Sequence, residues 1–438
     1  MFLTALWFIL VLSFLVFFHE LGHYLAARHV GVRVQRFSIG FPPRAIGRKV
    51  GETEYMLSWI PLGGYVKLEG QNLDDENPRD PRNYAAKTKL QRLYILLAGP
   101  VMNLVLALLL MPLVFMLGVE TPRYRLDPPV VAEVEAGSPA AQAGVRAGDR
   151  VVRLGTRETP SWNALDKALG EQPLTGNMVF RVARPGAAAG GAAASGAAAE
   201  LSVPAAAFAS SQPFGWKPLV EPVVGQVAPR SPAQQAGLQP GDRILAVNGV
   251  PVSQWDQMPA EIQKSKGAQL SLDVRRGNGT LKLALAPMRQ GGSWVIGISP
   301  GSVVERHGFV DSVRLGTERV AQITGSTFSF LGHLVMGQGS LDSLGGPVKI
   351  GVVIGEAARS GFDKLLFLTA LISLQLGIFN LLPIPALDGG HIFLIGVEWL
   401  ARRPLSVKVR ERAQIVGFSL LVALILVVTY NDVLQLIS

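Results

Sequence analysis

Residues 2–27 form one apolar run that is long enough to cross a bilayer, a passage that takes roughly 20 helical residues. Ionisable groups stand near the C-terminal end of this run, in His19-Glu20-Leu21-Gly22-His23. Ionisable side chains inside a membrane segment are costly and usually mark a function. The run lacks the basic start and the cleavage site of a signal peptide, so we expect a retained transmembrane helix that carries a chemical site.

The spacing of the two histidines indicates a metal site. Residues four apart lie on one face of a helix, so both imidazoles can bind the same zinc ion. Glu20 beside the first histidine can then act as a base toward water, as in the H-E-x-x-H arrangement of metalloproteases. The alternatives are a chance pentapeptide, or a helix end whose polar groups only reach the lipid headgroups.

Composition fits a chain that is partly membrane-embedded and partly soluble. The 438 residues allow several domains, and 49% of them are hydrophobic. Much of the positive charge flanks the apolar runs and does not form an aromatic-interleaved basic surface, so we expect no nucleic-acid partner. Cysteine is absent from the sequence, which excludes disulfides, thiolate metal ligands and a cysteine nucleophile.

Apolar runs predict four transmembrane helices, at residues 2–27, 93–117, 362–382 and 415–429. The segments 28–92 and 402–412 are rich in lysine and arginine, which favours the cytoplasmic side. Both chain ends, and the long stretch between the second and third helices, are then expected on the opposite side of the membrane.

The first basic segment is predicted to contain a small membrane-associated β-sheet. Residues 32–39 and 54–57 have strand-like composition, and residues 60–68 alternate apolar side chains around a glycine pair. Packed against the first helix, this sheet either caps the cytoplasmic mouth of the site or offers an edge strand that straightens an extended substrate.

The second apolar run carries small residues at its start, followed by Asn103. Small residues allow two helices to approach closely. Asn103 either bonds across to the histidine-bearing helix or is a single buried amide at a kink. His29, His307 and His333 have no ligand-spaced neighbours, so we expect them to be ordinary surface or packing residues.

An internal repeat organises the long stretch between the second and third helices. Residues 138–152 align without a gap with residues 231–245, and both copies contain Ser-Pro-Ala and Gly-Asp-Arg. In each copy Ser-Pro begins a short helix and Gly-Asp-Arg leads into a strand. The copies resemble PDZ domains of bacterial proteases, which bind an extended peptide or a C-terminus by strand addition. Alternatively, the modules bind nothing and block large ectodomains by their bulk.

Two segments of biased composition adjoin these modules. Residues 186–199 are almost entirely glycine and alanine, which predicts a flexible loop inserted between strands of the first module. Residues 320–361 are amphipathic and interrupted by glycines, and have too few continuous apolar residues to span a bilayer. We expect this region at the membrane interface, joining the modules to the membrane core.

The third apolar run ends in a broken segment that supplies the second half of the site. Pro383 and Pro385 remove backbone donors, and irregular backbone at membrane depth is tolerated only beside protein or a water-filled cavity. Asp388 is predicted as the third zinc ligand, which leaves a fourth position open, although it could instead only cap the following helix. The amide of Asn380 could hold the substrate backbone or a developing oxyanion. A fourth protein ligand would close the site, so His391 is left out.

Together these features predict a polytopic α-helical membrane protein with four transmembrane helices, a small membrane-associated β-sheet and two extracytoplasmic PDZ-like α+β domains. The expected divisions are 1–31 (first helix), 32–92 (hairpin and loop), 93–118 (second helix), 121–218 and 219–302 (PDZ-like domains), 303–361 (connector), 362–401 (third helix) and 402–438 (loop and fourth helix).

With H-E-L-G-H in the first span, Leu-Asp-Gly-Gly after a Pro-x-Pro break in the third, and tandem PDZ-like modules between the second and third, the chain resembles the site-2 protease family of intramembrane zinc metalloproteases. The likeness runs from end to end and is strongest to its bacterial sigma-E-regulating branch, which shares the stretches 37–41 and 60–67. The resemblance implies zinc bound by His19, His23 and Asp388, Glu20 as catalytic base, and a substrate-handling segment with Asn380, Pro383 and Pro385.

The resemblance also implies a biological setting. The chain would lie in a bacterial inner membrane, surrounded by lipid, with its PDZ-like modules in the periplasm. It would cut single-pass transmembrane substrates, namely an anti-sigma factor already shortened by a first periplasmic cleavage during envelope stress, and remnant signal peptides. A membrane zinc transporter or sensor would not need Glu20 as a base, and a membrane-anchored PDZ scaffold would not need the full ligand set. These are the alternative functions.

Overall fold

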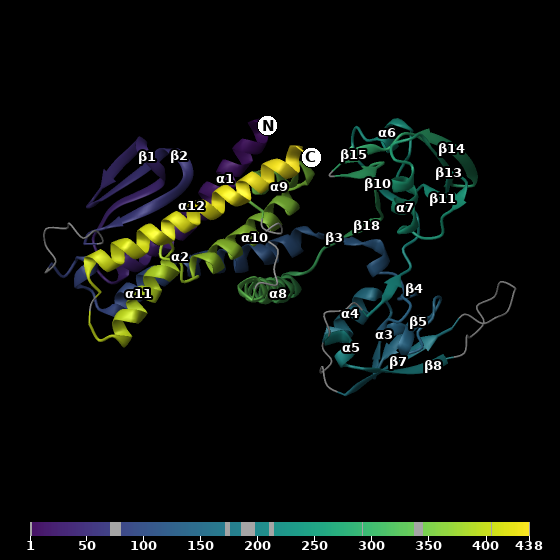
Figure 1. Ribbon diagram of the computed structural model, residues 1–438, viewed down its shortest axis with the longest axis horizontal. Helices are drawn as coiled ribbons and strands as arrows, with labels where there is room; N and C mark the ends of the chain where they lie inside the picture. The colour runs from purple at the N-terminus through teal and green to yellow at the C-terminus, as the bar shows by residue number, and fades with distance from the viewer. Residues whose placement is uncertain are drawn as a thin grey trace. The chain divides into compact units, whose positions relative to one another are not determined.

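The computed structural model describes residues 2–70, 80–170, 176–184, 198–209, 214–290, 292–336, 345–403 and 405–437. They form two compact units, shown with their elements in Figure 1. Unit 1 comprises residues 1–119 and 306–438, and unit 2 comprises residues 120–305. The four predicted membrane helices therefore belong to unit 1, and both copies of the repeat belong to unit 2.

The helices of unit 1 are α1 (Phe2–His29), α2 (Lys89–Leu117), α8 (Phe309–Val335), α9 (Pro347–Ser360), α10 (Phe362–Asn380), α11 (Asp388–Leu400) and α12 (Val407–Ile437). Four of those in the described residues are long and apolar enough to cross a membrane, which confirms the predicted number: α1, α2, α10 and α12. The fourth is much longer than the apolar run 415–429, because the helix continues through the polar residues at both ends of that run.

Small residues bring α1 and α2 into close contact. Gly22 faces the backbone of Ala98 so closely that a β-carbon at residue 22 would clash with the Ala98 carbonyl. A capping box formed by Thr88 and Gln91 fixes where α2 begins, since the Thr88 hydroxyl accepts a hydrogen bond from the backbone N–H of Gln91. The core around this contact joins α1, α2 and α10 through Leu15, Met111 and Leu374, which are all fully buried.

The predicted sheet is present as an antiparallel pair of long strands, β1 (Val34–Val50) and β2 (Thr53–Leu68). Both strands bend back, because residues 36–39 of β1 pair with residues 54–57 of β2 on one side and with residues 64–67 on the other. Residues 60–68, which we call the edge segment, therefore form an outer strand of this small sheet. The pair packs on α1 around Tyr24 and Phe37, and Figure 1 shows it beside the helices of unit 1.

The predicted amphipathic connector contains two regular helices, α8 and α9, with residues 337–344 outside the described part of the chain. Gly316 of α8 lies against Pro112 of α2. The N-terminus of α9 is capped from α12, where the buried carboxylate of Asp432 accepts hydrogen bonds from the backbone N–H groups of Gly346 (3.1 Å) and Lys349 (2.9 Å). Its placement at a membrane interface stays a prediction.

Unit 2 contains two modules with the same strand order. The first consists of β4 (Val131–Val134), α3 (Pro139–Gln142), β5 (Arg150–Leu154), β6 (Arg157–Glu158), α4 (Trp162–Gly170), β7 (Asn177–Ala183), β8 (Ala198–Pro204), α5 (Ala206–Ala209) and β9 (Trp216–Pro218). Its sheet has the order β6-β5-β7-β8, and β4 pairs with β9. Of the predicted Gly/Ala loop, residues 186–197 lie outside the described residues, and the last two belong to β8.

The second module consists of β10 (Val224–Val227), α6 (Pro232–Gln235), β11 (Arg243–Val247), β12 (Val250–Pro251), α7 (Gln257–Lys264), β13 (Leu270–Arg276), β14 (Gly279–Leu285), β15 (Met288–Gln290), β16 (Ser293–Val295) and β17 (Ile298–Pro300). The order β12-β11-β13-β14 and the pair β10–β17 match the first module, and β15 with β16 forms a further pair. The predicted repeat is thus one supersecondary unit built twice, although its assignment as a PDZ domain stays a prediction.

A buried aspartate locks each module at the Gly-Asp-Arg turn that the repeat contains. Asp242 accepts hydrogen bonds from the backbone N–H of Gln239 (2.8 Å) and from Nε and Nη2 of Arg276 (2.8 and 2.7 Å). In the first module Asp149 accepts bonds from the backbone N–H of Arg146 (3.0 Å) and from Nε of Arg184 (3.1 Å). The repeat therefore preserves an ion pair as well as a helix and a turn.

The chain enters unit 2 through β3 (Val119–Pro122) and the short helix η2 (Arg123–Arg125), and leaves it through β18 (Ser302–Glu305). Strands β3 and β18 pair with each other. The Thr121 hydroxyl donates to Glu305 Oε2 at 2.7 Å, and the backbone N–H of Arg123 donates to the Gly301 carbonyl at 2.8 Å.

Candidate metal centre

Helix α1 presents His19 and His23 on one face, one turn apart. Their rings meet edge to face with centroids 4.9 Å apart, and their Nε2 atoms are 3.3 Å apart. Both side chains are nearly buried, with exposed fractions of 11% and 12%. The i, i+4 spacing therefore brings the two ring nitrogens to one point, as the sequence predicted.

The break between α10 and α11 delivers Asp388 to the same point. Tight backbone turns fold residues 381–387, with hydrogen bonds from Ile384 N–H to Leu382 O (2.7 Å) and from Leu387 N–H to Ile384 O (2.8 Å). Gly389 and Gly390 lie against this folded backbone, where a β-carbon would clash with the carbonyls of residues 381, 382 and 384. Glycine is needed at both positions after Asp388, because residues 381–384 pack directly against the first turn of α11.

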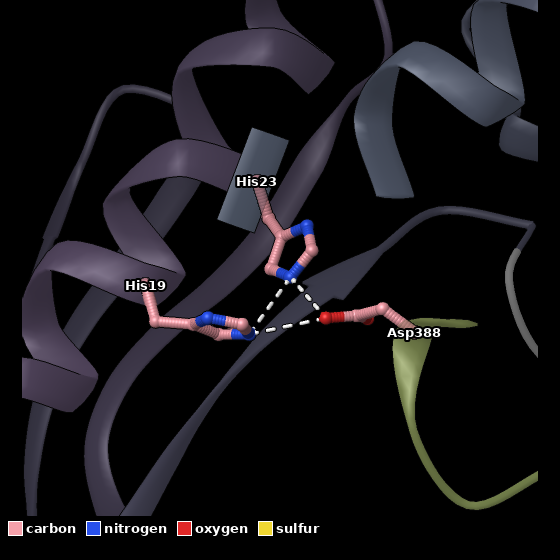
Figure 2. A group of neighbouring side chains, drawn as sticks. All are labelled: His19, His23 and Asp388. Atoms are coloured by element: carbon pink, nitrogen blue, oxygen red, sulfur yellow. Dashed lines mark hydrogen bonds and ion pairs between the residues drawn. The ribbon is translucent and has the colours of Figure 1, made fainter. Parts of the chain in front are cut away.

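Figure 2 shows the three side chains converging, the histidines from α1 and the aspartate from the first turn of α11. Asp388 Oδ2 lies 3.1 Å from His19 Nε2 and 3.3 Å from His23 Nε2. A tetrahedral zinc ion with bonds of 2.0–2.1 Å separates its ligand atoms by about 3.3 Å. Two imidazole nitrogens and a carboxylate oxygen at these separations therefore fit three corners of a zinc site.

The outer nitrogens of the two rings meet different partners. His23 Nδ1 is 2.8 Å from the backbone carbonyl of Ile95, and since a carbonyl only accepts, Nδ1 carries a proton and Nε2 is the nitrogen that faces Asp388 and His19. His19 Nδ1 is 3.2 Å from the side-chain nitrogen of Asn103, a fully buried residue of α2. Of the two alternatives for Asn103, the structure thus supports the bond across to α1.

Glu20 lies between the two histidines in sequence and faces the edge segment. The backbone N–H of Val66 lies near its carboxylate. Gly64 sits directly over the same helix face, where a β-carbon would lie 2.8 Å from Val16 Cγ1 and 3.3 Å from Glu20 Cγ. A glycine at this position allows the strand to pass close to the carboxylate.

A cavity of about 500 Å³ joins these groups. Its polar wall contains His19, Glu20, His23 and Asp388, and the remaining wall comes from several elements: Val16, Phe41, Gly63, Gly64, Tyr65, Val66, Leu68, Tyr84, Ile95, Leu96, Leu376, Asn380, Ala386, Leu387 and His391. The cavity is therefore bounded by membrane helices and by the edge segment. The candidate metal ligands His19, His23 and Asp388 lie together in its wall.

The predicted substrate-handling residues lie in different surroundings. Asn380 lines the cavity, and its side-chain nitrogen donates to the Leu376 carbonyl at 3.0 Å. Pro385 lines a second cavity of about 390 Å³, which also contacts α12 at Phe418. Pro383 forms part of the turn between α10 and α11 and does not line the cavity around the histidines.

Sequence reasoning did not single out Tyr84, which also lines the cavity. It belongs to the short helix η1 (Tyr84–Ala86), in a basic loop where a single tyrosine gives no signal. Burial raises the pKa of Tyr84 to about 12, so this phenol stays neutral at physiological pH. His391, which the sequence left out of the ligand set, stands in the wall of both cavities.

Comparisons with known proteins agree with this geometry. The model of peptidase family M50 matches residues 7–424. The chain is 35% identical to the regulator of sigma-E protease RseP of Escherichia coli, over 98% of this chain and 99% of that protein. It is 31% identical to the regulator of sigma E protease of Haemophilus influenzae, over 98% of each chain. A Neisseria meningitidis protein provisionally named a zinc metalloprotease is 32% identical, over 99% of this chain and all of that protein.

Proposed function

Because this chain belongs to peptidase family M50 and is a site-2 type metalloprotease, we propose that it cuts peptide bonds inside the membrane with zinc held by His19, His23 and Asp388. The observation that carries the proposal is the convergence of three ligand atoms from two distant helices at separations of 3.1–3.3 Å. The three residues supply only three ligand atoms and line the cavity, so a zinc ion held there would keep a coordination position for water, as hydrolytic zinc sites require.

In this proposal Glu20 is the general base. Zinc bound at the three ligands would polarise the scissile carbonyl and lower the pKa of water toward about 7. Glu20 takes the proton of the attacking water and returns it to the leaving amine. The N–H of Val66 would orient the carboxylate, and Asn380, which lines the cavity, would hold the substrate backbone or the oxyanion. Pro383 and Pro385 keep the chain broken, so that Asp388 reaches the histidines.

The edge segment is the proposed receiver of the substrate. A helical substrate hides its carbonyls in backbone hydrogen bonds, so it must unwind before attack. Residues 63–66 of this outer strand line the cavity beside Glu20, and adding a strand there would satisfy the backbone of an unwound substrate while holding it straight. This role is favoured over simple capping, because residues 63–66 line the cavity directly beside Glu20.

The proposed substrates are single-pass membrane proteins. Relatives named as regulators of sigma-E suggest an anti-sigma factor shortened by a first periplasmic cleavage, and remnant signal peptides are a second class. The basic segments 28–92 and 402–412 support an inner-membrane topology with both chain ends and unit 2 in the periplasm. In that position the two modules, at 121–218 and 219–302, are proposed to be PDZ-like domains that bind a peptide end or exclude bulky ectodomains.

The decisive experiment is co-expression of the chain with tagged single-pass membrane proteins, alongside a Glu20→Gln variant. We expect the wild-type chain to shorten the substrate and Glu20→Gln to leave it intact while keeping its zinc. His19→Ala and Asp388→Ala should lose both cleavage and zinc. Cleavage by Glu20→Gln would contradict the proposal, and zinc transport that survives Glu20→Gln would point to the transporter alternative.

A further inference from the structure

Asn103 is held at the back of His19, on the side away from Asp388. Its side chain is fully buried, and its amide lies 3.2 Å from His19 Nδ1. Its backbone carbonyl accepts a 2.8 Å hydrogen bond from the buried hydroxyl of Ser373 on α10. The residue is thus fixed by α2 and α10 and reaches across to α1.

The two states of His19 place opposite demands on this amide. A neutral imidazole carries one proton, so when Nε2 donates to Asp388, Nδ1 has a lone pair and needs a donor. When Nε2 binds a metal through its lone pair, the proton lies on Nδ1 and needs an acceptor. In the metal-free state the side-chain nitrogen of Asn103 can donate to Nδ1. In the metal-bound state its side-chain oxygen can accept from Nδ1.

An asparagine can meet both demands, because a half-turn of its amide exchanges the nitrogen and the oxygen. The Asn103 oxygen is buried without a hydrogen-bond partner, so no bond to that atom opposes the turn. His23 differs, since its Nδ1 faces a backbone carbonyl, which can only accept and cannot turn to offer a donor. Of the two imidazoles, His19 is therefore the one whose tautomer depends on a partner that can change.

We propose that Asn103 is a positioning residue that turns its amide oxygen to His19 Nδ1 when the metal binds, and thereby sets the metal affinity of the site. The inference rests on the proposed zinc site and adds a residue that the ligand motif does not contain. A partner that only donates would oppose metal binding, whereas one that only accepts would favour it.

Two substitutions separate this role from packing, since aspartate has almost the volume of asparagine, and leucine, although bulkier, cannot form the hydrogen bond. Asn103→Leu removes the partner, and Asn103→Asp leaves a group that can only accept. Metal-free full-length protein in detergent is titrated with Zn²⁺ against a chelating dye. We expect the dissociation constant to rise about 10–100-fold in Asn103→Leu, as for other partners of metal-bound histidines, and to stay within about threefold of wild type in Asn103→Asp.

The controls separate this inference from the zinc site itself. His19→Ala and Asp388→Asn should lose zinc, and if they bind it like wild type, the proposed site is wrong. If they lose zinc while Asn103→Leu keeps wild-type affinity, only the role of Asn103 is wrong. Equal losses in Asn103→Leu and Asn103→Asp would also overturn it, since both would then reflect packing. A wild-type thermal transition shows that each variant is folded.

Discussion

Gly99 of α2 lies directly against the imidazole of His23, with no space for a β-carbon between them. The ring therefore rests on the backbone of α2, and the same helix supplies the Ile95 carbonyl that holds its Nδ1. One turn of α2 thus fixes both the position and the tautomer of a candidate metal ligand. The small residues at the start of the second apolar run act on the site as well as on helix packing.

Replacement of Gly99 with alanine should disable the enzyme. The new methyl group must push His23 or α1 aside, and overpacking of this kind costs about 1–3 kcal/mol of stability. Because misplacing a reacting group by about 1 Å can cost 10²-fold in rate, we expect about a hundredfold loss of cleavage together with weaker zinc binding. Gly396→Ala on α11 is the control, since nothing lies within 4 Å of a β-carbon there. Equal activity of the two variants would contradict the role of Gly99.

Substrates with helix-breaking residues near the scissile bond should be cut faster. Each glycine lowers the cost of unwinding by about 1 kcal/mol relative to alanine, which corresponds to about a fivefold higher rate if unwinding limits cleavage. A matched series with Ala, Gly or Pro at one position of a tagged transmembrane segment, measured with the full-length enzyme, tests this expectation. Rates that are indifferent to these residues would rule out the unwinding step.

The second module should lose stability in acid. Burial of Asp242, whose side chain is only 1% exposed, opposes its ionisation, yet the hydrogen bonds from Arg276 and Gln239 outweigh burial and lower the pKa of this carboxyl. A depressed folded-state pKa stabilises the module above the unfolded-state value of about 3.9, and this stabilisation disappears as pH falls through the folded-state value. Hydrogen exchange of β11 and β13, corrected for intrinsic rates, should show protection falling below about pH 4.

Removal of the charge gives the matched control for this pH effect. Asp242→Asn should lower protection of the second module at neutral pH and flatten its acid dependence. The equivalent Asp149→Asn change should cost less in the first module, because Arg184 reaches Asp149 through Nε alone whereas Arg276 uses two nitrogens. An unchanged acid profile in Asp242→Asn would assign the pH dependence to other groups.

Asp432 should anchor α9 to the last membrane helix. Its carboxylate caps the N-terminus of α9, and loss of a helix cap costs about 1 kcal/mol. Asp432→Ala is therefore expected to speed hydrogen exchange in α9 about fivefold while α10 stays protected. Glu411→Ala, an exposed change on the same helix α12, should leave α9 unchanged. Unaltered exchange of α9 in Asp432→Ala would show that packing alone holds it.

Much of this architecture follows from short-range sequence patterns. Four apolar runs gave the number of membrane helices, and the repeat at residues 138 and 231 gave two modules of one design. The convergence of Asp388 on His19 and His23 followed from a chemical argument, because an intramembrane carboxylate after a Pro-x-Pro break needs a compensating partner. Features of this kind can be predicted from the sequence, because each local pattern has a physical cause that does not depend on distant contacts.

Other features depend on contacts between distant segments. The doubled pairing of β1 residues 36–39 cannot be derived from strand composition, which predicted only short separate strands. Tyr84 enters the cavity wall because its loop returns to the end of β2, where the Tyr84 N–H donates to the Glu69 carbonyl at 2.7 Å, and no local pattern indicates this. The sequence left open whether Asn103 bonds across to α1, and only its 3.2 Å distance to His19 Nδ1 decides it. The glycines of α8 and α9 concealed both helices from sequence analysis. Gly316 is tolerated because α2 packs against it, and Gly355 because α1 does.

Strands β3 and β18 lie side by side where the chain enters and leaves unit 2. The two ends of the inserted unit 2 therefore lie next to each other. A short loop in place of unit 2 could join them without changing the order or direction of the helices of unit 1. Because β3 follows α2 and β18 precedes α8, this pairing also keeps the end of α2 next to the start of α8, where the His307 N–H donates to the Phe115 carbonyl.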